Sequence, residues 1–546
     1  MRKIKIIFSG FLLFLSFGFA VSSLAKDWVY TVQPGDNLWI LSKKHLKSMR
    51  YWKDLVELNN VPDPYNIPPG TTLRFPMEWL KYGSSVATII ELTGEATIIE
   101  RNTGHELVAV KGKILWDNDS IRTAAESNAT LQFTDGSKVL IQAESEMKME
   151  RLVSYGATGM ADTKVRLESG RSHNNVIPHR GPGSRFEIST PSAIAAVRGT
   201  EYRISAEKAG ESRAEVLTGA VGVAGSGESK NVPEGFGTIS YPDKGPLDPV
   251  KLLPAPDLSG FPDTVLRVPF LLKPSKVEGA VQYRLQIAKD KHFLTLLYDK
   301  AFPSANMWGP DLPDNTYFLR VHGIDGKGLE GLYSVHSFVV QAHPVPPMQV
   351  APVADAVLQQ PVAVFQWSEP QEAEQYWFQL AADESFGKPV ADIKGLTSTT
   401  YTPDIAVVPG VYFWRVASVD GDGKTGPFSD PQKFRRTPPS PDMSDAEMDV
   451  EEMAFRWRKA EPGQSFTCQV AHDPEFTNLL FDDKVREPQY NLKHFEPGTY
   501  YIRVAIVDSD GFAGPFGPYQ TVHVPAPPPS PWAFSIPGAI MLLFML

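Results

Sequence analysis

The chain has 546 residues, a formal net charge of −10 and a single cysteine. An acidic chain lacks the basic face that binds nucleic acids, and one cysteine permits no internal disulfide, so each domain must be held by its own core. The length is enough for several domains. The 47 prolines and 42 glycines favour many short strands over long helices.

The first 25 residues have the features of a cleaved export signal. Three basic residues in the first five positions precede an uncharged apolar run, 6–21, and small residues lead up to a cleavage point after Ala25. A retained anchor is the alternative, but a spanning helix needs about 20 apolar residues. We therefore expect an exported protein of the periplasm or cell envelope. Losing three positive charges and no negative ones takes its net charge from −10 to −13.

Residues 28–77 predict a strand, two helices and a strand. Trp28, Tyr30 and Val32 alternate as on a half-buried strand, and a turn at Gly35 follows. Asp36 is placed to cap the first helix. A second helical pattern covers 52–58, and a closing strand covers 72–75.

This segment resembles a LysM domain through "YTVQPGDNLWILSKK" (30–44) and "WKDLVELNNVPDPYNIPPGTTLRFP" (52–76). LysM domains bind glycans that contain N-acetylglucosamine, in bacteria usually peptidoglycan. The resemblance implies a groove between the loops 35–38 and 61–67, although the turn and the cap alone would also require Gly35 and Asp36. The candidate glycan-binding residues are Gly35, Asp36, Asn37, Leu38, Pro62, Asp63, Tyr65, Asn66 and Ile67. The family often has threonine at the position of Asn37.

Residues 86–241 read as strand after strand around one core, with a hairpin signal at Asp135-Gly136. They resemble a FecR domain in "DNDSIRTAAESNATLQFTDGSKVLI" (117–141), "TPSAIAAVRGTEYRI" (190–204) and "VLTGAVGV" (216–223). The resemblance implies periplasmic signalling. Sensing members carry a cytoplasmic segment and a membrane span before this domain, where this chain has the LysM-like segment, which argues against a direct anti-sigma role. Arg122 and Arg198 are either partner contacts or structural arginines paired with carboxylates.

Three repeats of roughly 90 residues follow, at 252–342, 343–437 and 438–525. The segments "YRLQIAKDKHF", "YWFQLAADESF" and "FTCQVAHDPEF" align without gaps, and Arg320, Arg415 and Arg503 are equivalent. The repeats resemble fibronectin type III domains, which predicts Ig-like β-sandwiches that act as spacers or as a docking surface. Cys468 falls at a buried strand position, and "DGDG" (420–423) and "DSDG" (508–511) fit turns better than calcium loops.

The last segment, 526–546, is a proline-rich linker and an apolar tail, which would make shallow membrane contact, dock into a partner or pair as an edge strand. No catalytic pattern emerges, because the cysteine lies in a repeat core and His173 and His179 are a weak metal pair. We expect a multidomain, mainly β protein without catalytic residues or cofactor: a small βααβ LysM module, a β-rich FecR-like domain and three fibronectin-like sandwiches. It would bind peptidoglycan and present its β domains to envelope proteins. The alternative is a signalling component whose FecR-like domain receives a signal from an outer-membrane protein.

Overall fold

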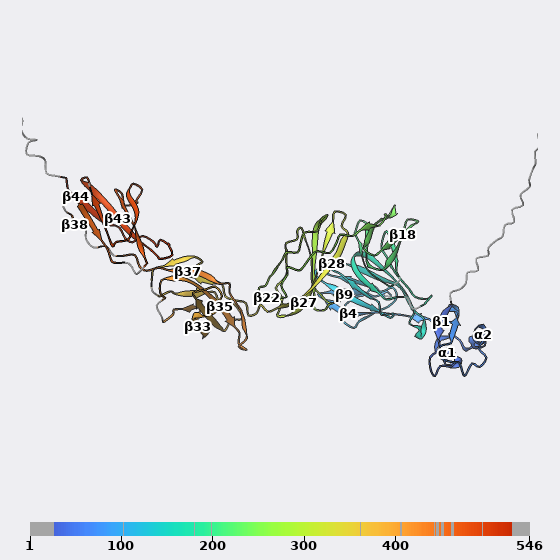
Figure 1. Ribbon diagram of the computed structural model, residues 1–546. Coiled ribbons are helices and arrows are strands. Elements are labelled where there is room, and N and C mark those ends of the chain that lie inside the picture. Colours follow the sequence, from blue (N-terminus) through green and yellow to red (C-terminus); the bar gives the residue numbers. More distant parts are fainter. Residues whose placement is uncertain are drawn as a thin grey trace, which may run out of the picture. The chain divides into compact units, whose positions relative to one another are not determined.

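The computed structural model describes residues 27–526 except 102, 179–180, 198, 361, 405–406, 442, 444–446, 449–451, 460–462 and 494. The predicted export signal, Arg198, His179 and the apolar tail from residue 527 lie outside the described residues. The chain divides into two units, 1–340 and 341–546, and each is described by itself (Figure 1). Among the described helices, none combines the length and the apolar character needed to cross a membrane.

The first element group is the expected βααβ arrangement. Its elements are β1 (Trp28–Thr31), α1 (Leu38–His45), the 3-10 helix η1 (Met49–Tyr51), α2 (Trp52–Leu58) and β2 (Thr72–Phe75). Strands β1 and β2 pair antiparallel, with Trp28 opposite Phe75. Leu38, Leu41 and Leu55 project from the two helices into one core and are fully buried. The apolar periodicity of this short segment is therefore sufficient to define its fold.

The cap of α1 differs from the prediction. Asn37, not Asp36, is the N-cap, and its Oδ1 accepts a hydrogen bond from Ile40 N at 2.8 Å. The Asp36 carboxylate instead accepts from Tyr30 Oη at 2.7 Å and from Gln33 N at 2.8 Å. Both residue types can cap a helix, and the turn through Gly35 at φ +91° leaves Asp36 facing back toward β1.

The second group is a closed arrangement of two mostly antiparallel sheets. Its strands are β3 (Gly83–Ser84), β4 (Ala87–Thr93), β5 (Ala96–Ile99), β6 (Glu106–Val108), β7 (Ile114–Leu115), β8 (Ser120–Thr123), β9 (Asn128–Phe133), β10 (Lys138–Ile141), β11 (Glu146–Ser154), β12 (Ala161–Val176), β13 (Arg185–Ser189), β14 (Ile194–Val197), β15 (Thr200–Ala206), β16 (Ser212–Thr218), β17 (Ala220–Gly225), β18 (Glu228–Pro233), β19 (Phe236–Tyr241), β20 (Gly245–Pro246) and β21 (Val250–Lys251). Strand β12 belongs to both sheets: its first half pairs with β11, and its second half pairs with β10 and β15. One apolar core runs between the sheets, as the alternating pattern predicts. Asp135-Gly136 forms the β9–β10 hairpin, with Gly136 at φ +96°.

The βααβ group is packed against this β domain through an ordered connection. The connection contains the 3-10 helix η2 (Met77–Trp79) and strand β3, which pairs with β11. Lys47 N donates to Trp79 O at 2.8 Å, and Lys81 N donates to His45 O at 2.7 Å. Met160 of the β domain is buried in the core of the βααβ group, just after the 3-10 turn η3 (Gly156–Thr158). The connection between the βααβ group and the β domain is therefore part of the packed structure.

A first β-sandwich completes the first unit. Its strands are β22 (Thr264–Val265), β23 (Leu271–Leu272), β24 (Ala280–Ala288), β25 (Leu296–Phe302), β26 (Met307–Trp308), β27 (Asn315–Asp325) and β28 (Glu330–Val340). One sheet has the order β22-β28-β27-β24-β25, and β23 pairs with β26. Asn128 Nδ2 donates to Leu296 O at 3.0 Å, and Thr130 Oγ1 donates to Leu294 O at 2.7 Å, so strand β9 holds the turn before β25. The first repeat therefore packs against the FecR-like domain and is not a separate domain that merely follows it in the chain.

The second unit contains two further sandwiches. Their strands are β29 (Gln349–Ala351), β30 (Ala356–Leu358), β31 (Phe365–Trp367), β32 (Gln375–Ala381), β33 (Pro389–Leu396), β34 (Thr400–Tyr401), β35 (Gly410–Val419), β36 (Thr425–Phe428) and β37 (Gln432–Arg436), then β38 (Glu447–Met448), β39 (Glu452–Arg456), β40 (Ser465–Ala471), β41 (Leu479–Val485), β42 (Gln489–Lys493), β43 (Gly498–Val507) and β44 (Gln520–Val524). Cys468 is fully buried in β40, as predicted. Residues 420–423 form the turn between β35 and β36.

The equivalent arginines of the three repeats have the same environment. The guanidinium carbon lies 4.4 Å and 5.4 Å from the ring centres of Phe293 and Tyr333 for Arg320. The corresponding distances for Arg415 are 4.1 Å and 4.2 Å, and those for Arg503 are 3.9 Å and 4.4 Å. In each repeat the arginine Nε also donates to a glutamine on the neighbouring strand. Stacking of this kind is a structural feature of the repeat.

Candidate functional site

The two loops nominated for glycan binding lie side by side in the βααβ group. Leu38 N donates to Pro64 O at 2.8 Å, which fastens the start of α1 to the loop between α2 and β2. Gly35, Pro62, Asp63, Tyr65 and Asn66 are exposed, and Asp36 and Asn37 are half-buried. Leu38 and Ile67 are buried in the core, so their side chains support the loops from below.

Several of these residues make hydrogen bonds that stabilise the loops themselves. Asp36 holds the β1–α1 turn, and its hydrogen bond raises the pKa of Tyr30 to about 12. Asn37 caps α1, and Asp63 Oδ1 accepts from Tyr65 N at 3.0 Å. The side chains of Pro62, Tyr65 and Asn66 make no hydrogen bond among the described residues, so they are the best placed to contact a ligand.

Two tryptophans that the sequence analysis did not nominate extend this surface. Trp52 at the start of α2 lies 6.4 Å from Tyr65 and 5.7 Å from Trp39, measured between ring centres. Trp39 is 46% exposed and Tyr65 is 63% exposed, which is unusual for large aromatic side chains on a small module. The indole N–H of Trp52 has no hydrogen-bond acceptor among the described residues. We call Trp39, Trp52 and Tyr65 the aromatic trio; the position of Trp39 two residues after "GDN" was the available sequence signal.

The roles of Asn37 and Asn66 give a matched pair of substitutions. Asn37→Ala should destabilise the βααβ group by about 1 kcal/mol, because the amide N–H of Ile40 loses its acceptor. Asn66→Ala should leave stability within about 0.5 kcal/mol, since its exposed side chain has no partner among the described residues. Hydrogen exchange of the α1 amides in both variants measures the difference. Equal exchange rates would contradict the assigned cap.

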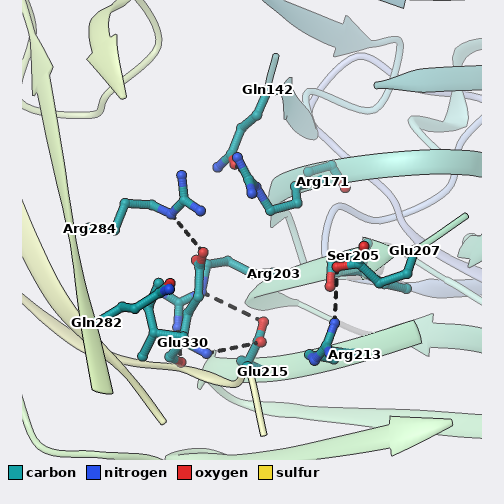
Figure 2. A pocket seen from close by; sticks show the side chains of 14 residues that line it. Gln142, Arg171, Arg203, Ser205, Glu207, Arg213, Glu215, Gln282, Arg284 and Glu330 are labelled. Atoms are coloured by element: carbon teal, nitrogen blue, oxygen red, sulfur yellow. Dashed lines mark hydrogen bonds and ion pairs between the residues drawn. The ribbon is translucent and has the colours of Figure 1, made fainter. Parts of the chain in front are cut away.

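A second concentration of polar side chains lies where the first sandwich meets the FecR-like domain (Figure 2). Arg203 on β15 is almost fully buried and places Nε 3.8 Å from Glu215 and 3.7 Å from Glu330. Its Nη2 donates to the backbone oxygens of Glu330 and Gly331. Arg284 of the sandwich donates to Glu330 Oε1 at 2.8 Å. A pocket of about 190 Å³ lies among these groups.

Most of the charged groups around this first pocket are paired with one another. Burial raises the pKa of Glu215 to about 7, against the opposing effect of Arg203. The pKa of Glu330 is held well below its usual range by Arg284 and His322, although burial acts in the opposite direction. Arg213 pairs with Glu207 and Glu211 at the rim. Arg171 has no carboxylate partner among the described residues, and its Nε donates to Gln142 Oε1 at 2.9 Å. Since the other three arginines are paired with carboxylates, the network mainly joins two domains.

Other candidate positions have structural explanations. Arg122 Nε lies 3.2 Å from Glu146 on the neighbouring strand β11, and its Nη1 lies 3.6 Å from Glu106 on β6, so it is paired with carboxylates, as its structural interpretation predicted. Burial raises the pKa of the Cys468 thiol to about 12, which makes it a poor nucleophile. Within the described residues, no group of three or more His, Cys, Asp or Glu side chains could hold a metal ion.

Comparison with models of known families gives two matches, one in the βααβ group and one in the β domain. The model of the LysM domain matches residues 30–76, and the model of the FecR protein matches residues 119–222. The chain carries a LysM domain and a FecR domain. Both are typical of cell-envelope proteins, and LysM domains bind peptidoglycan-type glycans. No curated protein matches the chain.

Solved structures with similar parts share little sequence with the chain. A putative anti-sigma factor from Parabacteroides distasonis is 19% identical, with 24% of this chain and 59% of that one covered and a TM-score of 0.21. A two-domain fibronectin type III segment of chicken tenascin is 14% identical, with 33% and 99% covered and a TM-score of 0.24. Fibronectin(III)-like modules of Clostridium thermocellum CbhA are 14% identical, with 33% and 94% covered and a TM-score of 0.18. The chain thus spans about three fifths of the anti-sigma factor, and the sandwich assignment rests on the strand order described above.

Proposed function

We propose that the protein is a non-catalytic component of the cell envelope that binds peptidoglycan through the surface formed by loops 35–38 and 61–67 and the aromatic trio. The exposed rings of Trp39 and Tyr65, on either side of the half-buried Trp52, are the observation that carries this proposal. Aromatic faces stack on the apolar faces of sugar rings, while loop amides bond to N-acetyl groups. The LysM match supports the ligand class. The predicted export signal supports a periplasmic location.

Glycan binding is tested by co-sedimentation of the chain from residue 26 with purified peptidoglycan sacculi. We expect the parent protein to pellet and the double variant Trp39→Ala/Tyr65→Ala to lose at least about tenfold in affinity, because both exposed rings are removed. The matched control is Trp116→Ala/Tyr82→Ala, which removes rings that are 46% and 70% exposed outside the LysM domain. Deletion of residues 26–80 should abolish pelleting. Equal losses in the two double variants would refute the assigned surface.

A signalling role is the second candidate, and the FecR match over residues 119–222 is the observation that favours it. In that case the FecR domain would receive a stimulus from an outer-membrane protein. In-cell crosslinking from exposed positions of this domain, such as Trp116, checks the idea. Recovery of an outer-membrane protein that persists after deletion of residues 26–80 would favour signalling over wall attachment.

A further inference from the structure

A second pocket, of about 380 Å³, lies in the same contact between the FecR domain and the first sandwich. Strands β10, β12 and β15 supply one wall, and the turn before β25 together with β27 and β28 supplies the other. Its lining includes Leu140, Ile177, Phe293 and Val335 as apolar groups, with Lys138, Lys291 and Arg320 as cations. Its volume lies at the small end of the range of small-molecule sites.

The cations of this second pocket lack carboxylate partners, whereas most cations around the first pocket are paired with carboxylates. Lys138, Lys291 and Arg320 have no ion pair with a carboxylate among the described residues. The one acidic group in the lining, Glu201, accepts hydrogen bonds from His173 Nε2 and Tyr333 Oη, both at 2.8 Å. Three cations therefore face one carboxylate that already has two partners, in a chain whose overall charge is −10.

Arg320 is the most constrained of these cations. Its side chain is 3% exposed, and the rings of Phe293 and Tyr333 fix the plane of the guanidinium. Nε donates to Gln286, whereas the two terminal nitrogens have no hydrogen-bond partner among the described residues. Burial lowers the pKa of Arg320 to about 10, so the group stays charged at neutral pH with its desolvation only partly offset.

The corresponding arginines of the other two repeats show what is particular to this position. Arg415 and Arg503 have the same stacking and the same glutamine bond but are half-buried, whereas Arg320 is buried. In the first repeat, the FecR domain lies over the stacked guanidinium of Arg320 and contributes Lys138 and His173 to the opposite wall of the pocket. A structural element of the repeat thus forms one wall of a cationic pocket.

We propose that this second pocket binds a small organic carboxylate with an apolar body, held by Arg320, Lys138 and Lys291. A planar carboxylate matches the free fork of a fixed guanidinium, and the two lysines add charge at the mouth. The apolar body would fill the space between Phe293, Leu140 and Val335. Inorganic phosphate would satisfy the charges but leave the apolar wall uncovered, which is why a carboxylate with a hydrocarbon body is the better match.

The test is isothermal titration calorimetry of the chain from residue 26 with benzoate, N-acetyl-leucine and N-acetyl-phenylalanine. The neutral amides of these acids and inorganic phosphate serve as the comparison ligands. We expect at least one acid to bind, its amide to bind at least about tenfold more weakly, and phosphate to bind more weakly than the acid. Binding of none of the acids at about 10 mM, or equal binding of acid and amide, would overturn the proposal. Equal binding of phosphate would reduce the pocket to an unspecific anion site and would also overturn it.

Variants at the mouth of the pocket separate binding from folding. Lys138→Met/Lys291→Met removes two cations that have no partner in the described part of the chain, so the fold should be unaffected and carboxylate affinity should fall at least about tenfold. The control, Lys208→Met/Lys244→Met, removes the same charge from exposed turns outside the pocket lining and should leave affinity unchanged. Equal affinities in the two variants would refute the site. Neither variant touches the LysM surface, so the outcome is independent of glycan binding.

Discussion

Replacing Arg203 by methionine should destabilise the first unit by about 3–5 kcal/mol, because it leaves Glu330 and Glu215 buried without their shared cation. The substitution also removes two donors to the backbone oxygens at the start of β28. Urea unfolding followed by hydrogen exchange of the β15 and β28 peptides measures the effect. The loss should appear in both strands together, since the network joins the two domains.

A surface ion pair of the same unit provides the control for this prediction. Arg74 Nη2 lies 2.6 Å from Asp27, but its side chain is 55% exposed, so Arg74→Met should cost no more than about 1 kcal/mol. If Arg203→Met costs no more than Arg74→Met, the buried network does not hold the two domains together. A loss confined to β15, with β28 unchanged, would also contradict the assigned role.

The stability of the first unit should fall steeply on acidification from pH 6.5 to pH 4.5. Burial lowers the pKa values of His45, His173 and His322 to about 4. The unfolded chain therefore binds three more protons at these sites near pH 5.5. Glu215, with its pKa raised to about 7, binds one proton more in the folded state and opposes the trend. The net uptake on unfolding is about two protons, which corresponds to a loss on the order of 2–3 kcal/mol per pH unit.

Urea midpoints at several pH values between 7.5 and 4.5 check this expectation. His322→Gln should reduce the pH dependence by about 1.4 kcal/mol per pH unit, because one proton fewer is taken up on unfolding. His105→Gln, at an exposed position, should leave the slope unchanged. Below pH 4.5 the loss should continue. Although burial acts in the opposite direction, the hydrogen bonds from His173 and Tyr333 lower the pKa of Glu201 to about 2, and its stabilising contribution disappears as it becomes protonated. A flat profile down to pH 4.5 would show that the histidines are charged when folded.

Much of the local structure follows from the sequence for simple reasons. In the LysM domain, alternation at Trp28 and Tyr30 and helical spacing at Leu38 and Leu41 predict the strand and helix that the structure contains. The cap was misassigned because aspartate and asparagine are equally good caps and stand next to each other. The turn at Gly35 decides between them, and its geometry is not a property of either residue alone.

The contact between the FecR domain and the first sandwich could not be predicted in the same way. Arg203 lies in "EYRIS" and Glu330 in "GLEGLY", and each reads as an ordinary polar position on a strand. Nothing local distinguishes them from exposed residues, because their burial arises from contact between segments more than 120 residues apart. The unmatched cations of the second pocket were hidden for the same reason. Trp39 was overlooked because an aromatic residue at a helical spacing usually belongs to a core, and here it does not.

The ordered connection between the LysM domain and β11 has a mechanical consequence. Under the proposed wall attachment, cell-wall motion would pull on α1 and β2, and that load would pass through the hydrogen bonds of Lys47 and Lys81 and the β3–β11 pairing directly into the β domain. A flexible linker would first extend under such a displacement, whereas this ordered junction has no spare length. Strain in the glycan network should therefore reach the β domain without delay, because the junction is a stiff mechanical coupling.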